Sequence, residues 1–420
     1  MSLSAAPSSV FVPEDLHAGL LLLLPVKSLL RFKCVSNSWN TLISDSNFVK
    51  LHLKKSKSLN SHFTLITRDV KTIEGETADE SDVDFSIISY SIRSFVDNHS
   101  FNLYVDHHYL LNIKDCIWIS GSCDGLICLI GVRIVPAPNG YYETEYWLRI
   151  WNPATRAISE KFGIFRGLIC YAFHLGCDNS TGTFKVVATR YVRGDEGEAS
   201  EVNVFSFGDN AWRNIESFPV IPILLHDDTH NVVFFNGTLN WLVVENDTAY
   251  TWYNYPGEFT VEKFVIISLD LATETYNMYM LPVGFADVQP AIPTIGLLGE
   301  CVCFSYCSHK EADFIIWQMN KFGDEESWTQ FLKISCNDLH IDYDFSDDRK
   351  YCFNILPLFM SKDGDTLILH CTEESEAILY NWRNNIVERT RVIIVGGRDG
   401  TRKNHRGWRK YNLINNVNYN

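Results

Sequence analysis

The sequence predicts a small N-terminal all-α module followed by a large all-β domain, which we expect to form a β-propeller of about six blades. A leucine-rich segment with helical periodicity in residues 12–55 predicts the first part. Segments rich in β-branched and aromatic residues, each followed by a similar hairpin, predict the second part over residues 61–395. The remaining residues, 396–420, are basic and are expected to form a flexible tail.

The helical module begins at a proline that is followed by two acidic residues. Pro13 is tolerated at a first helical position, and Glu14 and Asp15 place negative charge at the positive end of the helix dipole. Four leucines then follow at i, i+4, i+7 and i+8, which places them on one apolar face. They are Leu16, Leu20, Leu23 and Leu24. Pro25 is expected to end this segment, and Asp45 to cap a last helix.

The apolar surface of this module exceeds what so small a unit can bury. About 45 residues hide too little of their own surface to cover that many leucines, so we expect the excess to contact another protein. Docking onto the rest of the same chain is the alternative. The uninterrupted apolar stretch Ala18–Val26 has nine residues, whereas a membrane-spanning helix needs about 20. No Lys or Arg precedes it as in a signal peptide, so we expect no membrane association.

The β domain contains five strong strand candidates, each followed by a hairpin-like unit. The candidates begin at Gly125, Phe184, Thr238, Glu300 and Asp365. The turns of four hairpins align at Thr155, Asn210, Thr273 and Asn384, with spacings of 55, 63 and 111 residues, the last spanning two units. A period near 57 residues is compatible with four-stranded propeller blades that carry insertions. Residues 62–111 are expected to supply a further blade, and a closed ring would protect the sheet edges.

Charge and cysteine content narrow the class of function. The net charge of the chain is −15, and the excess of acidic residues lies in residues 61–395. Repulsion between these residues and phosphate argues against nucleic-acid binding. Twelve cysteines in 420 residues are far below the density of disulfide scaffolds. We therefore expect free thiols in a reducing compartment.

Two stretches of sequence resemble known domains. "VPEDLHAGLLLLLPVKSLLRFKCVSNSWNTLI", from Val12, resembles the F-box, the helical module that binds the Skp-type adaptor of cullin-based ubiquitin ligases. "SCDGLICL", "WNPATR", "FFNGTLNWL" and "ISLDLATET" resemble the F-box-associated, kelch-like propeller domain of the large plant F-box family. Together the two resemblances cover nearly the whole chain.

The resemblance implies a non-catalytic substrate receptor of an SCF-type (Skp–cullin–F-box) ubiquitin ligase, without cofactor or metal. The F-box would bind the Skp-type adaptor and, through it, a cullin scaffold, and the β domain would bind an unknown protein substrate. Such ligases work in the cytoplasm and the nucleus, where we therefore expect this chain. The positions that match the F-box are the candidate adaptor-binding residues, although the sequence does not separate contact from core positions. They are Val12, Pro13, Leu16, Leu24, Pro25, Leu29, Leu30, Val35 and Trp39.

Three departures from the F-box pattern leave alternatives open. The family usually has an aliphatic residue at His17, Glu at Gly19 and Arg at Leu23. Gly19 costs roughly 1 kcal/mol of helix stability relative to Ala. A binding propeller with a degenerate F-box, acting outside ubiquitination, is therefore the first alternative. A propeller enzyme, or one that binds a glycan or another small molecule, is the second.

The β domain offers few candidates for catalysis or metal binding. Cys301, Cys303, Cys307 and His309 alternate along one strand, where same-face residues stand too far apart to share a zinc ion. We expect these cysteines to pack between sheets as small apolar side chains. The segment "HDDTH" from His226 lacks a helix to align its histidines, and "DYDFSDD" from Asp342 lacks the glycine of a calcium loop. We therefore predict no catalytic, cofactor or metal site.

One loop is a candidate for substrate binding. "YTWYNYPGEF", from Tyr250, places aromatic side chains beside a proline and a glycine. Tyrosine and tryptophan are enriched at interface hot spots, which favours Trp252, Tyr253 and Tyr255 as substrate contacts. The alternative is that these rings pack against neighbouring blades.

Overall fold

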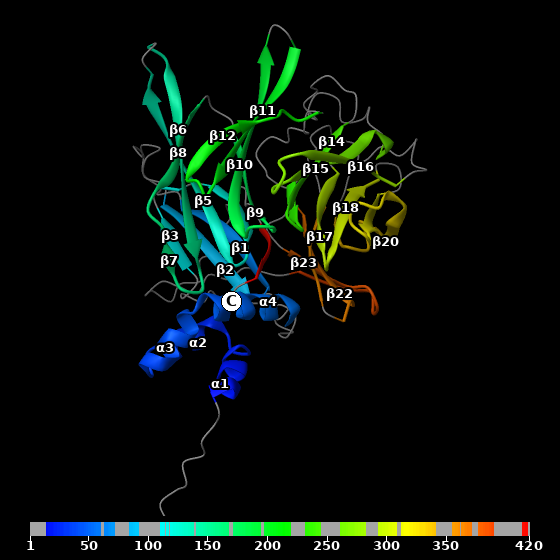
Figure 1. Cartoon of the computed structure of the whole chain (residues 1–420). Coiled ribbons are helices and arrows are strands. Elements are labelled where there is room, and N and C mark those ends of the chain that lie inside the picture. Colours follow the sequence, from blue (N-terminus) through cyan, green and yellow to red (C-terminus); the bar gives the residue numbers. More distant parts are fainter. Residues whose placement is uncertain are drawn as a thin grey trace, which may run out of the picture.

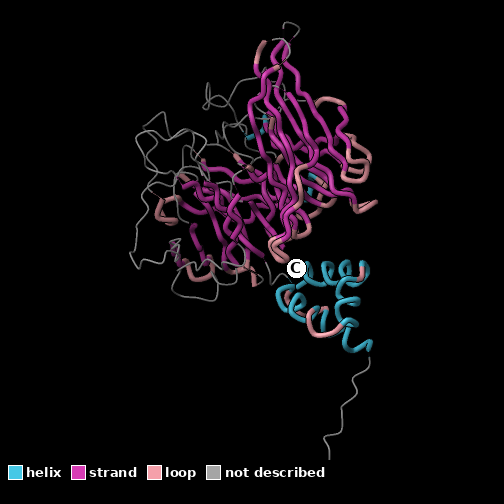
Figure 2. Tube along the Cα trace, turned by 90° about the vertical axis from the view of Figure 1, so that its left-hand side faces the viewer, coloured by secondary structure: helices cyan, strands magenta, loops and turns pink. Residues whose placement is uncertain are grey.

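The structure is a computed structural model of the whole chain, in which a group of helices stands at one end of a large β domain (Figure 1). The residues that it describes are 14–59, 63–71, 84–91, 110–113, 115–116, 118–137, 140–167, 171–194, 197–219, 232–244, 261–282, 293–308, 312–341, 355–361, 363–371, 377–389 and 414–418. The α-helices are separated from the strands along the chain and in space, as Figure 2 shows, and two short 3-10 helices, η3 (Val261–Lys263) and η4 (Glu325–Ser327), lie within the β domain. The predicted class, a small all-α module before a large all-β domain, is confirmed.

The N-terminal module consists of four helices. They are α1 (Glu14–Leu21), α2 (Val26–Lys33), α3 (Asn37–Ser44) and α4 (Ser46–Leu59). Pro25 precedes α2, with φ −59° and ψ 147°, in agreement with the prediction that the chain leaves the helical conformation there. Asp45 accepts hydrogen bonds from the backbone N–H groups of Asn47 and Phe48 at 2.9 and 3.0 Å, which confirms it as the cap of the last helix.

The β domain consists of six antiparallel sheets in the described residues. The first contains β25 (Ile414–Asn418), β1 (Phe63–Lys71), β2 (Asp84–Ser91) and β3 (Leu110–Ile113), and the second β4 (Trp118–Cys123), β5 (Leu126–Pro136), β6 (Tyr142–Asn152), β7 (Ala157–Ile158) and β8 (Phe162–Gly167). The third contains β9 (Ala172–Asp178), β10 (Thr183–Gly194), β11 (Gly197–Ser206) and β12 (Ala211–Ile215), and the fourth β13 (Val232–Phe235), β14 (Thr238–Val244), β15 (Phe264–Asp270) and β16 (Tyr276–Met280). The fifth contains β17 (Thr294–Leu298), β18 (Cys301–Cys307), β19 (Asp313–Met319) and β20 (Trp328–Ser335), and the sixth β21 (Ile355–Met360), β22 (Thr366–Cys371), β23 (Ala377–Asn381) and β24 (Ile386–Arg389).

The sheets form a closed ring, which makes the domain a six-bladed propeller. Six strands, β4, β9, β13, β17, β21 and β25, each contact the next in this order, and β25 also contacts β4. These strands therefore lie innermost, and the other strands of each blade are arranged outward from them. The inner strand of each described sheet therefore lies against the inner strands of its two neighbours, in agreement with the predicted closed ring.

The blade that closes the ring is built from both ends of the chain. Strand β25 pairs antiparallel with β1, and Phe63 lies opposite Asn418. The prediction of a flexible basic tail over residues 396–420 is therefore wrong for Ile414–Asn418. The reason is that β1 would otherwise present an unpaired inner edge, and the segment that contains Ile414 and Val417 supplies the missing strand.

Each of the five strongest strand candidates corresponds to the second strand of a blade, counted outward from the centre of the ring. The candidates near Gly125, Phe184, Thr238, Glu300 and Asp365 correspond to β5, β10, β14, β18 and β22. These strands have a neighbour in the sheet on either side and blades packed on both faces. In β10, for example, Val186, Val187 and Ala188 are all fully buried. Burial on both faces requires continuous apolar runs, which are the clearest strand signal in a sequence.

A recurring turn joins the third and fourth strands of four blades. In each turn the fourth residue after the end of the third strand has a positive φ of 52° to 62°, and these residues are Arg156, Asn210, Glu274 and Asn385. In three of the turns, a side-chain oxygen of the last strand residue accepts a backbone N–H within the turn. The hairpin repeat is confirmed. Thr155, Thr273 and Asn384 occupy the same turn position, as the predicted alignment has it, but Asn210 lies one residue later in its turn.

An ion network joins the third blade to the fourth. The ammonium group of Lys185, on β10, donates to a carboxylate oxygen of Glu274 at 2.9 Å and also to the carbonyl oxygen of Leu271. Arg213, on β12, donates to the same carboxylate. The Lys185 side chain is only 7% exposed, so its charge depends on these partners.

Burial alone would raise the pKa of Glu274, but hydrogen bonds from Arg213 and Lys185 outweigh burial and hold this pKa below its usual value. A lowered carboxyl pKa stabilises the folded state at neutral pH. This contribution is lost as the pH falls through the pKa of the folded state.

We predict that Glu274→Gln lowers the free energy of unfolding by about 2 kcal/mol, because the buried ammonium of Lys185 would lose a charged hydrogen-bond acceptor. Lys185→Met should cost less, since it removes the buried charge together with its need for a partner. Urea unfolding of the two variants at pH 7 would measure both costs. A larger cost for Lys185→Met would contradict this account.

Candidate functional site

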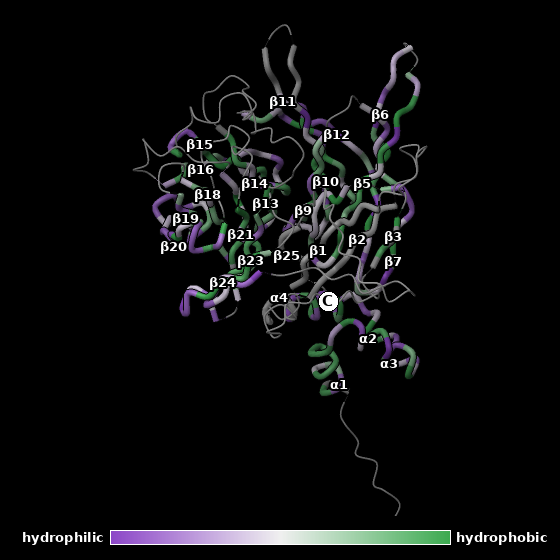
Figure 3. The backbone as a smooth tube through the Cα atoms, turned by 180° about the vertical axis from the view of Figure 1, so that it is seen from behind, coloured by the Kyte–Doolittle hydropathy of each residue, from purple (hydrophilic) through white to green (hydrophobic). Residues whose placement is uncertain are grey.

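The most exposed apolar side chains of the helical module include three that lie along α1 and the turn after it. Leu16, Leu20 and Leu23 are 58%, 59% and 52% exposed. Leu16 and Leu20 are four residues apart, which places them on one side of α1. Leu23 follows in the next turn, where its N–H donates to the carbonyl oxygen of Leu20 at 3.1 Å. We call these three residues the leucine stripe. Helix α1 lies at the end of the module away from the sheets (Figure 3), so the alternative that the stripe docks onto the described part of the β domain is wrong.

The module has its own small core, which is distinct from the leucine stripe. Four buried side chains form it, one from each helix: Leu21, Leu29, Ile43 and Phe48. Partly buried side chains surround them: Leu22, Leu24, Phe32, Trp39 and Leu42. The rings of Phe32 and Trp39 meet edge to face with centroids 5.0 Å apart. Because the core is complete without the leucine stripe, the stripe is free to contact another molecule.

A buried histidine fixes the turn between α1 and α2. His52, on α4, is 5% exposed, and its Nε2 lies 2.8 Å from the carbonyl oxygen of Leu24. With Nε2 protonated, the imidazole donates to this carbonyl. The His52 ring also stacks on Phe48 at an interplanar angle of 16°. This contact ties the turn to α4 and so sets the position of Leu23 and Pro25 on either side of Leu24.

The structure divides the predicted adaptor-binding residues into three groups. Leu16, Pro25 and Val35 are exposed and available to a partner. Leu29 is buried in the module core, and Leu24, Leu30 and Trp39 are half-buried. Val12 and Pro13 lie outside the described residues.

The predicted set omits two members of the leucine stripe. Leu20 and Leu23 are about as exposed as Leu16, although neither was among the candidates taken from the F-box pattern. The signal that could have identified them was the helical spacing from Leu16, which predicts a shared face.

Gly19 lies beside this stripe on α1 and is open to solvent. A Cβ built at Gly19 would have no atom within 4 Å outside its own helix. No close contact therefore requires a glycine at this position. Gly19 lowers the stability of α1 only through its poor helix propensity.

The cysteines of the fifth blade lie in an apolar environment. Cys303 and Cys307, on β18, are 0% and 1% exposed and belong to a core cluster shared with the sixth blade. Burial raises the pKa of the Cys303 thiol to about 12. Burial likewise raises the pKa of the Cys307 thiol, so both are protonated at neutral pH, in agreement with the packing interpretation. Within the described part of the chain, no group of three or more His, Cys, Asp or Glu residues could hold a metal ion.

Several other candidates lie outside the described residues. They are Trp252, Tyr253 and Tyr255, the segment from His226 to His230, the loop from Asp342, and His309. Among the residues that the structure describes, no helix is long and apolar enough to cross a membrane.

Comparison with protein families gives two matches. Residues 82–405 match the F-box associated beta propeller domain, and residues 12–51 match the F-box domain. The first match covers most of the six-bladed ring, and the second covers α1, α2, α3 and the start of α4. The leucine stripe and the module core therefore both lie within the F-box match.

Two curated relatives are proteins of Arabidopsis thaliana. An F-box/kelch-repeat protein is 28% identical over 339 residues, covering 77% of this chain and 79% of its own length. The F-box protein CPR1 is 24% identical over 339 residues, covering 77% of this chain and 73% of its own length.

Solved structures give more distant matches. An oligogalacturonate lyase in complex with manganese is 12% identical with a TM-score of 0.37, covering 78% of each chain. The β-propeller domain of the Trilobed protease from Pyrococcus furiosus is 11% identical with a TM-score of 0.36, covering 78% of this chain and 86% of its own. At these TM-scores neither match bears on the function of this chain.

We predict that His52→Ala loosens the helical module, because the carbonyl group of Leu24 would lose its buried partner and a cavity would form beside Phe48. The expected loss is about 2 kcal/mol of local stability. Hydrogen exchange of the backbone amides of α1 to α4 would detect it as faster exchange. Lys54→Ala, an exposed change on the same helix, is the control, and equal exchange in both variants would contradict the role given to His52.

Proposed function

The chain belongs to the F-box associated beta propeller domain family and carries an F-box before its propeller, and from this premise we propose that it is the substrate receptor of an SCF-type ubiquitin ligase. In this role the F-box binds a Skp-type adaptor, which connects the chain to a cullin scaffold. The β domain binds the protein to be modified. The receptor supplies no chemical group to the reaction. It raises the local concentration of the substrate beside an enzyme that partners provide.

The leucine stripe is the observation that carries this proposal. Three leucines more than half exposed, two on α1 and one in the turn that follows it, are costly to leave in water. Helix-in-groove recognition uses apolar anchors at this i, i+4 and i+7 spacing. The stripe therefore suits an apolar groove on a protein partner, and its place in the F-box match supports the Skp-type adaptor as that partner.

The proposal also extends to location. Ten cysteines of the described residues are not in disulfide bonds, which fits a chain that works in a reducing compartment. We propose that this compartment is the cytoplasm, the nucleus or both, where cullin-based ligases operate. Fractionation of plant cells that express the tagged chain would test this assignment.

We predict that Leu20→Lys weakens binding to a plant Skp-type adaptor at least tenfold, because it would bury an unpaired charge in an apolar interface. Leu20 is 59% exposed, so the unfolding temperature should stay within about 2 °C of wild type. Calorimetric titration of the full chain with purified adaptor would measure the affinity.

Ile164→Lys is the matched control, since Ile164 is 61% exposed but lies on β8 in the propeller. It should leave adaptor binding unchanged. Equal binding by Leu20→Lys and Ile164→Lys would contradict a role for the leucine stripe. Absence of binding by the folded wild-type chain would favour the alternative of a degenerate F-box.

Gly19 provides a separate test of that alternative. We predict that Gly19→Ala stabilises α1 by up to about 1 kcal/mol, since the position is open and alanine is the better helix former. Adaptor binding should be retained or strengthened, because less ordering of α1 remains to be achieved on binding. Weaker binding by Gly19→Ala would instead mean that the partner approaches the backbone at this glycine.

A further inference from the structure

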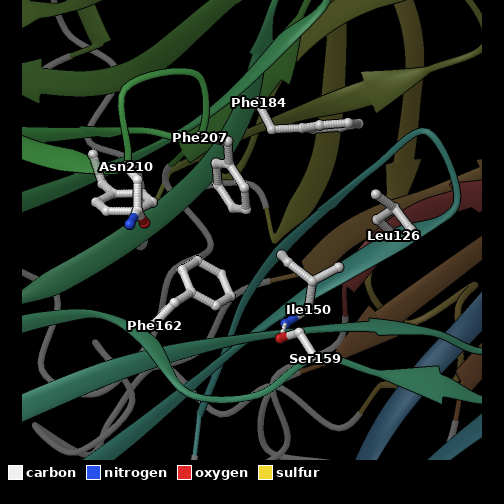
Figure 4. A pocket seen from close by; sticks show the side chains of 8 residues that line it. Leu126, Ile150, Ser159, Phe162, Phe184, Phe207 and Asn210 are labelled. Carbon is white, nitrogen blue, oxygen red and sulfur yellow. Dashed lines mark hydrogen bonds between the residues drawn. The ribbon is translucent and has the colours of Figure 1, made fainter.

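A pocket lies at the seam between the second and third blades. Its volume is ≈ 350 Å³, and its walls come from β5, β6 and β8 on one side and from β10 and the β11–β12 hairpin on the other. Six apolar side chains form most of the lining (Figure 4): Leu126, Ile150, Phe162, Phe184, Phe205 and Phe207. Among the sheets in the described residues, only that of the second blade has a fifth strand.

The second blade is irregular where the pocket forms. Strands β7 and β8 both pair with β6, so they divide between them the outer position that a single strand fills in other blades. Between them, the N–H of Ser159 donates to the carbonyl oxygen of Ile150 at 2.8 Å. The N–H of Ile150 donates to the Ser159 side-chain oxygen, also at 2.8 Å, in place of a backbone carbonyl. The carbonyl oxygen of Ser159 is thereby released and accepts from Arg149 at 2.7 Å.

This exchange lets the chain leave the regular ladder without leaving the Ile150 N–H unpaired. The single donor of the Ser159 hydroxyl is also used, since it donates to the carbonyl oxygen of Glu160 at 2.9 Å. Ser159 therefore shapes the pocket but offers it no free donor.

Strand β8 also crosses toward the third blade. The Nε1 of Trp212, on β12, donates to the carbonyl oxygen of Gly163 at 2.8 Å. Gly163 has a φ of +56°, and a Cβ there would lie 2.9 Å from Leu148 and 3.3 Å from Phe205. Only a glycine permits this close approach without displacing its neighbours. The close approach of Gly163 brings the preceding residue, Phe162, to the seam between the two blades. There the ring of Phe162 contacts the ring of Phe207, with centroids 5.2 Å apart.

The chemistry of the lining defines what the pocket can hold. None of the eight lining residues is charged, and the polar ones are Ser159 and the exposed Asn210. A charged ligand would lose its hydration without gaining a counter-ion. Phenylalanine rings, in contrast, favour the faces and edges of another aromatic ring.

The size of the pocket adds a second constraint. An apolar cavity of about 150 Å³ accepts one benzene molecule. The ≈ 350 Å³ here is roughly twice that volume and falls within the range of small-molecule sites. We propose that this pocket binds a small, neutral, aromatic molecule of about two fused rings. This site is separate from the leucine stripe, so its existence does not depend on the proposed ligase function.

Naphthalene is a suitable probe because it has two fused rings and no charge. Saturation-transfer NMR with the full chain should detect saturable binding. The anion 2-naphthoate, which has the same rings and one negative charge, should bind at least tenfold more weakly. Equal binding of the two probes would overturn the assignment of a neutral ligand.

Phe162→Trp should reduce naphthalene binding at least tenfold, because the larger ring would fill the space beside Phe207. Leu126→Phe fills the pocket from a different strand and should have the same effect if Phe162→Trp fails to fold. Phe322→Trp, the same exchange at a half-buried position in the fifth blade, should bind as the wild type does. No saturable binding by the wild type, or equal binding by the wild type and a folded filled variant, would overturn the proposal.

Discussion

The pairing of β25 with β1 is the contact on which the arrangement of the molecule depends. It joins residues from the two ends of the chain in one blade and so closes a ring of six sheets. Without it, β4 and β21 would lose their shared neighbour, and β1 would expose an unpaired edge. Because α4 ends at Leu59 and β1 begins at Phe63, the same contact anchors the helical module close to the seam of the ring. In the proposed role of a receptor that acts by proximity, this short connection is an advantage, since a long flexible one would lower the effective concentration of the bound substrate.

The two parts of the chain bury their apolar side chains in different ways. In the propeller, the middle strands are covered on both faces, and ion pairs such as Lys185 with Glu274 join adjacent blades. The helical module has a core of four buried side chains and leaves the leucine stripe exposed. So small a module cannot bury all of its leucines, and the described part of the β domain does not cover them. The small size of the helical module therefore explains why the leucine stripe is exposed. A partner protein that binds the stripe is the simplest way to remove these side chains from water.

Features encoded in a local pattern of residues could be predicted from the sequence, whereas features that depend on contacts between distant residues could not. The second strands of the blades were recognisable because burial on both faces leaves continuous apolar runs, as at Val186 and Val187. The sequence predicts a tail at Ile414–Asn418 because this segment has no strong strand signal of its own, and its place in the ring is set by contacts with β1, β4 and β21. Likewise, matching to the F-box pattern selects Leu29, which is core, and omits Leu20, which is exposed and which helical spacing places on the same face as Leu16. The link between His52 and Leu24 joins residues 28 positions apart, so no local pattern could reveal it.

Departures from the repeat are the places where a propeller can acquire a specific function. Five sheets of the described ring use four strands each. In the second blade the outer position is split, Ser159 substitutes its hydroxyl for a backbone carbonyl, and Gly163 allows β8 to reach the next blade. Packing alone does not require this arrangement, because an unbroken outer strand would satisfy the same ladder with fewer side-chain hydrogen bonds. The broken strand instead leaves an aromatic pocket at the seam. A ligand held there would contact two blades at once, and its binding free energy would be added to the stability of the ring.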